Sequence, residues 1–219
     1  YKTNNTLKRY HSENVIQEER KFTKNQKLNT LMNSFKIIQE GIDNLYLVKN
    51  RKINIRLYVV IVCKNNIKKF YLYEKGKCIY ANKKNNENLD KEVQLTSYNL
   101  DKDIYSNHPE TLDELKKYMK EKNYKILYTN IIDLFKNVFE GIKDEICNNK
   151  KLSNITTFQL FGCDIIFNKN LNPFLLEFNK GPSMKFITDV DKQMKLGLIE
   201  DVFSLVGLLK KNNNFIEIK

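Results

Sequence analysis

The sequence predicts an α+β fold in which a mainly antiparallel sheet is flanked by helices. Three observations support this class. Residues 53–63 form a long run of β-branched and aromatic residues typical of a strand. Residues 158–168 and 173–179 form a second apolar pair with a short polar turn between them. Helical patterns stand between and after these runs, and strands and helices in this order favour an α+β architecture.

The first third of the chain is expected to change from polar segments to strands. We expect an irregular region over the first 34 residues, interrupted by a short helix over 26–32. Strands are then expected at four places, with a turn at Gly76 between the last two: 35–40, 53–63, 70–73 and 78–81. Residues 82–92 are rich in Asn and Lys and are expected to form a polar loop.

Helices dominate the middle and the end of the chain. Thr111 precedes Leu112, Asp113 and Glu114, the pattern of a capped helix with acidic residues in its first turn. A longer helix follows, with apolar residues at helical spacing at Ile131, Leu134, Phe135, Val138, Ile142 and Ile146. A last helix is expected over 189–209, and its apolar stripe predicts a core face: Met194, Leu198, Val202, Leu205 and Leu209.

The composition favours a globular protein and argues against nucleic acid as its partner. The chain has 219 residues, is 41% hydrophobic, and carries a net charge of +12. Only 4 of its 38 basic residues are Arg, and it contains 30 Asn and a single Ala. This bias is typical of A-rich codons, whereas Arg is the preferred side chain for guanine and phosphate. The excess of Lys would still attract an acidic polypeptide. No apolar run is long enough for a membrane helix, no signal peptide is visible, and we expect no membrane partner.

The reactive side chains exclude some classes of chemistry. The four cysteines form no C-x-x-C pair, and we expect them to be free, buried thiols in a reducing compartment: Cys63, Cys78, Cys147 and Cys163. His11 and His108 are the only histidines, so zinc sites and Ser-His-Asp catalysis are poorly supported.

The hairpin at 158–179 contains the most informative polar residues. A four-residue turn would pair Asn168 with Pro173, and it would therefore place Asp164 opposite Glu177. Two carboxylates that face each other across a strand pair repel unless a positive group lies between them.

Asp164, Glu177 and Asn179 are therefore candidate metal ligands. Asn179 follows Glu177 by two residues and lies on the same strand face. Such oxygen donors suit Mg²⁺, which completes its shell with water and nucleotide phosphate. The alternative is a solvated sheet face, which is disfavoured by the apolar residues expected on it: Leu160, Ile166 and Leu175.

A second candidate cluster lies at the start of the 53–63 strand. Period-two alternation places Lys52, Asn54 and Arg56 on one face. A row of donors that includes a planar guanidinium can hold phosphates and the oxyanion formed from them. An ordinary edge strand with its polar residues outward remains the alternative.

Four short motifs between residues 38 and 183 occur in an order typical of one enzyme family. They are Lys52-Ile53-Asn54-Ile55-Arg56; Tyr71-Leu72-Tyr73-Glu74-Lys75-Gly76; Gln94-Leu95-Thr96-Ser97-Tyr98; and Phe161-Gly162-Cys163-Asp164 followed by Leu175-Leu176-Glu177-Phe178-Asn179-Lys180-Gly181-Pro182-Ser183. In this order they resemble the tubulin tyrosine ligase and tubulin polyglutamylase family of ATP-grasp ligases. The closing pattern is the most specific of the four.

The resemblance implies an ATP-grasp fold whose N-terminal part is missing or diverged. Residues 1–42 would be a remnant of the central subdomain, and residues 43–219 would be the C-terminal subdomain. A chain that begins with Tyr1 would then be the C-terminal two-thirds of such a ligase.

The resemblance also implies the chemistry and the partners. ATP would phosphorylate a carboxylate, and the amine of a free amino acid would attack the acyl phosphate with Mg²⁺ present. The acceptor would be an acidic protein, such as a tubulin tail or microtubules, and the location cytoplasmic, associated with the cytoskeleton or the axoneme.

Particular residues take roles by the same resemblance. Asp164, Glu177 and Asn179 would hold the magnesium ions, and Arg56 would face the phosphates and the activated carboxylate. Arg56, Glu177 and Asn179 would thus form the catalytic set. The nucleotide contacts would be Lys52, Thr96, the ribose position Asn54, Gln39 and Glu40 at the adenine hinge, and Lys2 at the phosphates.

Several positions depart from the family pattern. Asn54 replaces an acid, Ile79 and Glu40 replace basic residues, and Gln94 and Ser97 replace His and Asn. A divergent ligase and a catalytically inactive module with a structural or microtubule-binding role both fit these changes. A nucleic-acid module, the third class, would bind any polyanion without needing Asp164. The lysines between residues 64 and 84 are expected to be solvated: Lys64, Lys68, Lys69, Lys75, Lys77, Lys83 and Lys84.

Overall fold

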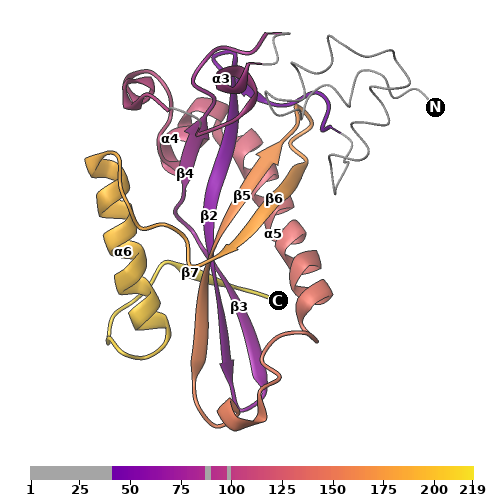
Figure 1. Cartoon of the computed structure of the whole chain (residues 1–219), viewed down its shortest axis with the longest axis vertical. Coiled ribbons are helices and arrows are strands. Elements are labelled where there is room, and N and C mark those ends of the chain that lie inside the picture. The colour runs from indigo at the N-terminus through magenta and orange to yellow at the C-terminus, as the bar shows by residue number, and fades with distance from the viewer. Residues whose placement is uncertain (1–40, 87–89, 98–99) are drawn as a thin grey trace, which may run out of the picture.

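The computed structural model describes residues 41–86, 90–97 and 100–219, and it confirms the α+β class (Figure 1). Its sheet has seven strands in the order β6-β5-β2-β3-β7, and β1 and β4 also pair with β2. All the pairs in this described part are antiparallel. The strands are β1 (Leu47–Val48), β2 (Arg51–Lys64), β3 (Ile67–Tyr73), β4 (Lys77–Tyr80), β5 (Thr157–Phe167), β6 (Pro173–Lys180) and β7 (Phe215–Ile218). The helices are α3 (Lys91–Gln94), η2 (Lys102–Ser106), α4 (Leu112–Met119), α5 (Glu121–Ile142), η3 (Lys150–Leu152) and α6 (Asp189–Leu205).

Strand β2 is the centre of the molecule, because its two faces contribute to two different cores. The odd-numbered residues, including Ile55, Leu57 and Val59, join the larger core with side chains from α4 and α5. Tyr58 and Val60 join a smaller core beneath α6. Figure 1 shows α6 on one side of the sheet and α4 and α5 on the other. The polar residues at 52, 54 and 56 share the α6 face of the sheet, since side chains alternate along a strand.

The turn predicted at Gly76 is wrong in its geometry. Strands β3 and β4 do not pair with each other; they lie one after the other along β2, which is long enough for both. Gly76 stands at the break between them, where an added Cβ would lie 2.7 Å from the carbonyl oxygen of Arg56. The glycine therefore allows a close approach of two backbones rather than a reversal of the chain.

The predicted helices are confirmed, with shorter ends. Thr111 caps α4 through a capping box with Glu114. Helix α6 ends at Leu205, so the part of the expected stripe at Leu209 lies beyond the helix and is exposed. Strand β7 was not predicted, although its last three residues, Ile216-Glu217-Ile218, alternate between apolar and acidic. The helix expected over 26–32 and the strand over 35–40 lie outside the described residues, and the division of the chain at residue 42 stays a prediction.

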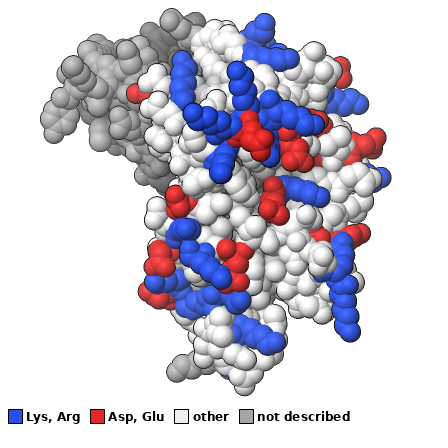
Figure 2. Space-filling view, turned by 180° about the vertical axis from the view of Figure 1, so that it is seen from behind, with Lys and Arg blue, Asp and Glu red and all other residues white. Residues whose placement is uncertain are grey.

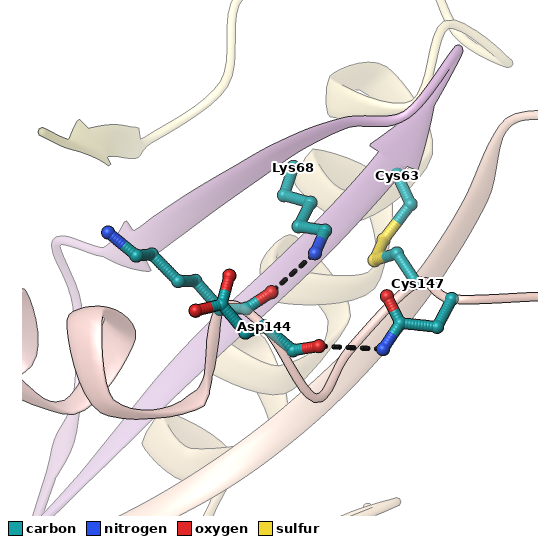
Figure 3. The surroundings of a disulfide bond; sticks show 6 residues. Cys63, Lys68, Asp144 and Cys147 are labelled. Atoms are coloured by element: carbon teal, nitrogen blue, oxygen red, sulfur yellow. Dashed lines mark hydrogen bonds between the residues drawn. A yellow bond between two sulfur atoms is a disulfide. The ribbon is translucent and has the colours of Figure 1, made fainter.

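The expectation of four free thiols is wrong for two cysteines. A disulfide joins Cys63, near the end of β2, to Cys147, which follows α5, with 6.1 Å between the Cα atoms (Figure 3). Beside it, Lys68 Nζ donates to the carbonyl oxygen of Lys143 at 2.5 Å. Cys78 and Cys163 are free and buried, and burial raises the pKa of both thiols. Sequence spacing could not reveal the bond, because the half-cystines are 84 residues apart.

The charged side chains are mixed over the surface. Figure 2 shows Lys and Arg interspersed with Asp and Glu on one face of the molecule. Of the lysines expected to be solvated, Lys77 is an exception, with only 5% of its surface exposed. No helix of the described ranges is both long and apolar enough to cross a membrane.

Candidate functional site

The β5–β6 hairpin places Asp164 opposite Glu177, as its sequence predicts, but by a different route. Pro173 pairs with Phe167, one residue earlier than expected, and a β-bulge between Asp164 and Ile165 restores the predicted pairing. The bulge also moves Leu175 opposite Ile165, on the core face. Leu175 therefore does not share the face of the carboxylates, and that part of the expectation is wrong.

Arg56 compensates the facing carboxylates. It is the neighbour of Asp164 across β2 and β5, and its Nε and Nη2 donate to Oδ1 and Oδ2 of Asp164, the latter at 2.8 Å. Its Nη2 also lies 3.9 Å from Glu177 Oε1. The side chains of Arg56 and Asp164 are 21% and 12% exposed, whereas that of Glu177 is 49% exposed. The hydrogen bond to Asp164 is the main cause that raises the pKa of Arg56.

The side-chain oxygens of Asp164, Glu177 and Asn179 are of a kind that fits a magnesium ion. Asn179 Nδ2 donates to Glu177 Oε1, so the three predicted ligands lie in one connected group. Within the described ranges, no cluster of three or more His, Cys, Asp or Glu side chains is arranged for a metal. The predicted set has instead two carboxylates and one amide, which are hard oxygen donors of the kind that Mg²⁺ takes together with water and phosphate. A divalent cation would also relieve the repulsion between Asp164 and Glu177.

Gly162 explains the glycine of the Phe-Gly-x-Asp motif. It pairs with Tyr58 on β2 and with Asn179 on β6. A Cβ at this position would lie 2.8 Å from Cβ of Pro182 and 3.5 Å from Cδ of Arg56. The missing side chain therefore lets the chain after β6 cross over β5 next to Arg56.

The residues predicted to contact the nucleotide gather at the start of β2. Lys52 Nζ donates to Gln94 Oε1, and Thr96 forms a bridge with Ala81, whose amide donates to the Lys52 carbonyl at 3.1 Å. Asn54 is buried opposite Ile79. Lys52 and Thr96 are thus connected through Ala81, and Lys52 and Asn54 precede Arg56 on β2 by four and two residues. Lys2, Gln39 and Glu40 lie outside the described residues.

A pocket of about 290 Å³ adjoins Arg56 on the side of β4. Its walls come from β2, β4, η2 and the residues just before it, the segment after β6, and the first half of α6. Tyr58 is one of its lining residues, and burial is the main cause that raises the pKa of this phenol to about 12. The charged side chains at the pocket are Arg56, Lys77, Lys185, Asp191 and Lys195.

The sequence reasoning missed Lys77 and Asp191. The sequence predicts a solvated Lys77, and the pattern around Asp191 predicts only the apolar stripe of a helix. The two side chains form an ion pair of 2.9 Å and are almost fully buried. Period-two alternation from Ile79 would have placed Lys77 on the polar face, but its burial depends on α6, which no local pattern locates.

Comparisons with known proteins agree with this architecture. Residues 11–214 match the tubulin-tyrosine ligase family. The chain is 26% identical over 183 residues to the probable tubulin polyglutamylase TTLL9 of Rattus norvegicus, covering 78% of this chain and 38% of that protein. It is 28% identical over 192 residues to tubulin glycylase 3D of Tetrahymena thermophila, and this match covers 80% of this chain and 18% of that protein. It is 26% identical over 191 residues to tubulin polyglutamylase ttll-5 of Caenorhabditis elegans, and this match covers 77% of this chain and 26% of that protein.

The chain thus spans well under half the length of these relatives. Its mainly antiparallel sheet with helices on both faces is consistent with the ATP-grasp architecture expected from the motifs. The family match extends over nearly all of the described residues and includes both candidate clusters. This chain belongs to the tubulin-tyrosine ligase family.

Proposed function

We propose that the chain is the metal- and phosphate-binding part of an ATP- and Mg²⁺-dependent ligase that joins an amino acid to a protein acceptor such as a tubulin tail. The observation that carries the proposal is the pairing of Asp164 with Glu177 beside Arg56, on the face of β2 that also bears Lys52. One side of this group contains oxygen donors for a cation, and the other contains cations for phosphates or a carboxylate.

The proposed roles differ between the oxygen ligands and the positively charged or neutral polar residues. Asp164, Glu177 and Asn179 would hold Mg²⁺, which when bound neutralises phosphate charge. Lys52, Asn54 and Thr96 would contact the nucleotide, and Lys2, Gln39 and Glu40 are proposed contacts beyond the described residues. Arg56 can orient an anion through its guanidinium, which is fixed by Asp164. Formation of an amide bond through an acyl phosphate needs positioning and charge neutralisation, so it needs no Ser or Cys nucleophile.

The relatives support the class of acceptor and of amino acid. The names of two of them specify tubulin polyglutamylation and that of the third tubulin glycylation. We extend tubulin, or microtubules, to this chain as the acceptor, a free amino acid as the second substrate, and a cytoplasmic location at the cytoskeleton or axoneme.

Nucleotide binding and turnover test the proposal. We expect ATP to bind only with Mg²⁺, and binding to be lost in Asp164→Ala and in Glu177→Ala. Asp133→Ala on α5 and Glu217→Ala on β7 are matched controls, because both acids lie on other surfaces. Incubation of the full chain with ATP, Mg²⁺, glutamate or glycine, and tubulin should add amino-acid mass to tubulin. Full activity with both site acids removed would overturn the assignment.

An inactive module is the second candidate, and one observation favours it. Arg56 already binds both oxygens of Asp164, and Asn54 and Ile79 present no charge beside them. A module of this kind would co-sediment with microtubules equally well in the wild type and in both Ala variants, and it would bind no Mg²⁺–ATP.

A further inference from the structure

The disulfide between Cys63 and Cys147 lies apart from the candidate ligase site. Cys63 is the last residue but one of β2, whereas Arg56 lies in the first half of this strand. Both half-cystines are partly exposed, in contrast to the free cysteines Cys78 and Cys163, which are fully buried. Access is one of the factors that decide whether a disulfide exchanges with a dissolved thiol, and here it distinguishes the bonded pair from the free thiols.

Two adjoining hollows open beside the disulfide. The larger has a volume of about 520 Å³, within the range of small-molecule sites, and the smaller about 40 Å³. Asn66, Cys147 and Ser153 line both hollows, whereas Cys63 lines only the smaller one. A thiolate attacks a disulfide from the side opposite the sulfur that leaves. Approach through the larger hollow therefore favours attack at Cys147, with Cys63 as the leaving group.

The walls of the two hollows are basic and polar. Lys64 and Lys68 are among the lining residues, and no Asp or Glu of the described ranges is; the nearby Asp144 is not one of them (Figure 3). Amides and hydroxyls that can pair with a peptide backbone come from the other polar lining residues: Asn66, Asn148, Asn149, Ser153 and Thr157. This lining fits a small peptide that carries negative charge.

Lys68 brings a positive charge next to Cys63. The two residues are direct partners across β2 and β3, so their side chains lie on the same face. The carbonyl oxygen of Lys143, at the end of α5, accepts from Lys68 Nζ at 2.5 Å (Figure 3). A neighbouring ammonium group favours a thiolate over a thiol, and a stabilised thiolate leaves faster in disulfide exchange. Cys63 is thus suited to be the sulfur that leaves.

We propose that Cys147 is the site of a reversible thiol–disulfide exchange with a small acidic peptide thiol of the glutathione class. The peptide thiolate forms a bond with Cys147 Sγ, the bond between the two protein sulfurs breaks, and Cys63 leaves as a thiolate that takes up a proton. A second peptide thiol then attacks the peptide sulfur of this mixed disulfide, which releases Cys147 as a thiol and forms the oxidised peptide disulfide. The two peptide thiols are oxidised, the protein disulfide is reduced, and the oxidised peptide drives the reverse reaction.

The exchange makes the fold respond to the redox state of its surroundings. A reducing pool of the peptide thiol opens accessible disulfides, and an excess of its oxidised form closes them. Opening removes the covalent link between the end of β2 and the segment that follows α5. This inference goes beyond the proposed ligase function and does not depend on nucleotide binding.

Reaction of the folded full chain with reduced glutathione tests the site. The mixture is quenched with acid and the modified cysteines are located by peptide mass spectrometry. We expect glutathione on Cys147, a free thiol on Cys63, and no adduct on the buried Cys78 or Cys163. An adduct on Cys63, or no reaction until the chain is unfolded, would overturn the proposal. Reduction by thioredoxin with glutathione inert would also overturn it, because the bond would then be the substrate of a protein dithiol.

A matched pair of peptide thiols tests the recognition of negative charge. Glutathione and its diester carry the same thiol, but the diester lacks both carboxylates. Each rate of disulfide opening is divided by the rate of the same thiol with a neutral model disulfide. We expect the normalised rate of glutathione to be about threefold or more above that of the diester, and the difference to shrink with added salt. Equal normalised rates would refute the acidic class of ligand.

Variants assign the effect of charge to Lys68. Lys68→Met should slow the reaction with glutathione about threefold or more and reduce the preference for glutathione over its diester. Lys69→Met is the matched control, because it removes the next lysine of β3, which pairs with Glu217 instead. A folded Lys68→Met variant that reacts like the wild type would overturn the role of Lys68. If this variant does not fold, the comparison of the two thiols on the wild type decides.

Discussion

Arg56 and Asp164 form a two-pronged ion pair across β2 and β5, in which Nε and Nη2 of the guanidinium each donate to one carboxylate oxygen, the second at 2.8 Å. Both side chains are mostly buried. In this arrangement the protein itself neutralises Asp164, and a cation that binds between Asp164 and Glu177 has to compete with Arg56 for the same oxygens.

Loss of Arg56 should therefore weaken the fold and strengthen cation binding. We expect Arg56→Met to lower the free energy of unfolding by about 1–3 kcal/mol without Mg²⁺, because it leaves a mostly buried carboxylate unpaired. Addition of Mg²⁺ should raise the Tm of this variant more than that of the wild type. Urea denaturation and thermal melts measure both effects. Arg56→Met/Asp164→Asn is the control: with the carboxylate removed, the extra response to Mg²⁺ should disappear.

Gly162 should tolerate no side chain. We expect Gly162→Ala to destabilise the fold by about 1–3 kcal/mol, because the new Cβ would overlap Pro182 and push the chain after β6 away from Arg56. Denaturant unfolding gives the change in free energy. Gly141→Ala on α5 is the matched control; no atom lies within 4 Å of its added Cβ, and it should stabilise the helix by up to about 1 kcal/mol. A neutral Gly162→Ala would contradict the close packing of Pro182 over β5.

The disulfide between Cys63 and Cys147 should stabilise the fold. The double variant Cys63→Ser/Cys147→Ser is expected to lose about 2–4 kcal/mol in the free energy of unfolding, since a long loop is no longer closed in the unfolded chain. Treatment of the wild type with dithiothreitol should lower its Tm to that of the double variant. The same treatment should leave the variant unchanged, because Cys78 and Cys163 are free. An unchanged Tm of the wild type after reduction would contradict the prediction.

His108 should make the fold sensitive to mild acid. Its pKa lies below the usual 6.5, mainly because burial disfavours the charged ring, which packs against Tyr80 with the ring centres 5.1 Å apart. The unfolded chain therefore binds a proton at this residue more readily than the folded one. Stability that is present above pH 6.5 is lost as the pH falls through 6.5 towards the lower folded pKa. Between pH 7.5 and pH 5, the Tm of the His108→Gln variant should fall less than the Tm of the wild type, as measured by thermal melts at constant ionic strength. Parallel acid profiles of the two proteins would refute this role.

Much of the architecture was predictable because its signals are local. The alternation in 53–63 and the hydrophobic spacing in 131–142 predict β2 and α5 from neighbouring residues alone. The pairing of Asp164 with Glu177 was also predictable, since the connection of this hairpin is short. The bulge that turns Leu175 to the core face was not, because it depends on how β6 packs against α5 and the core.

Long-range contacts account for what the sequence could not show. The disulfide joins residues 84 apart, and β3 and β4 share one neighbour rather than each other. The sequence alone predicts that Lys77 is a surface lysine. In the structure α6 packs over β4, and Lys77 is buried against Asp191.

The sequence by itself therefore determined the α+β class, the order of most elements and the motifs that mark the family, because each depends on spacing along the chain. Only the tertiary structure decided that Arg56 neutralises Asp164 and that Lys77 is a buried charge at a pocket. The physical reason is that the charge and burial of a side chain depend on partners brought together from distant parts of the chain.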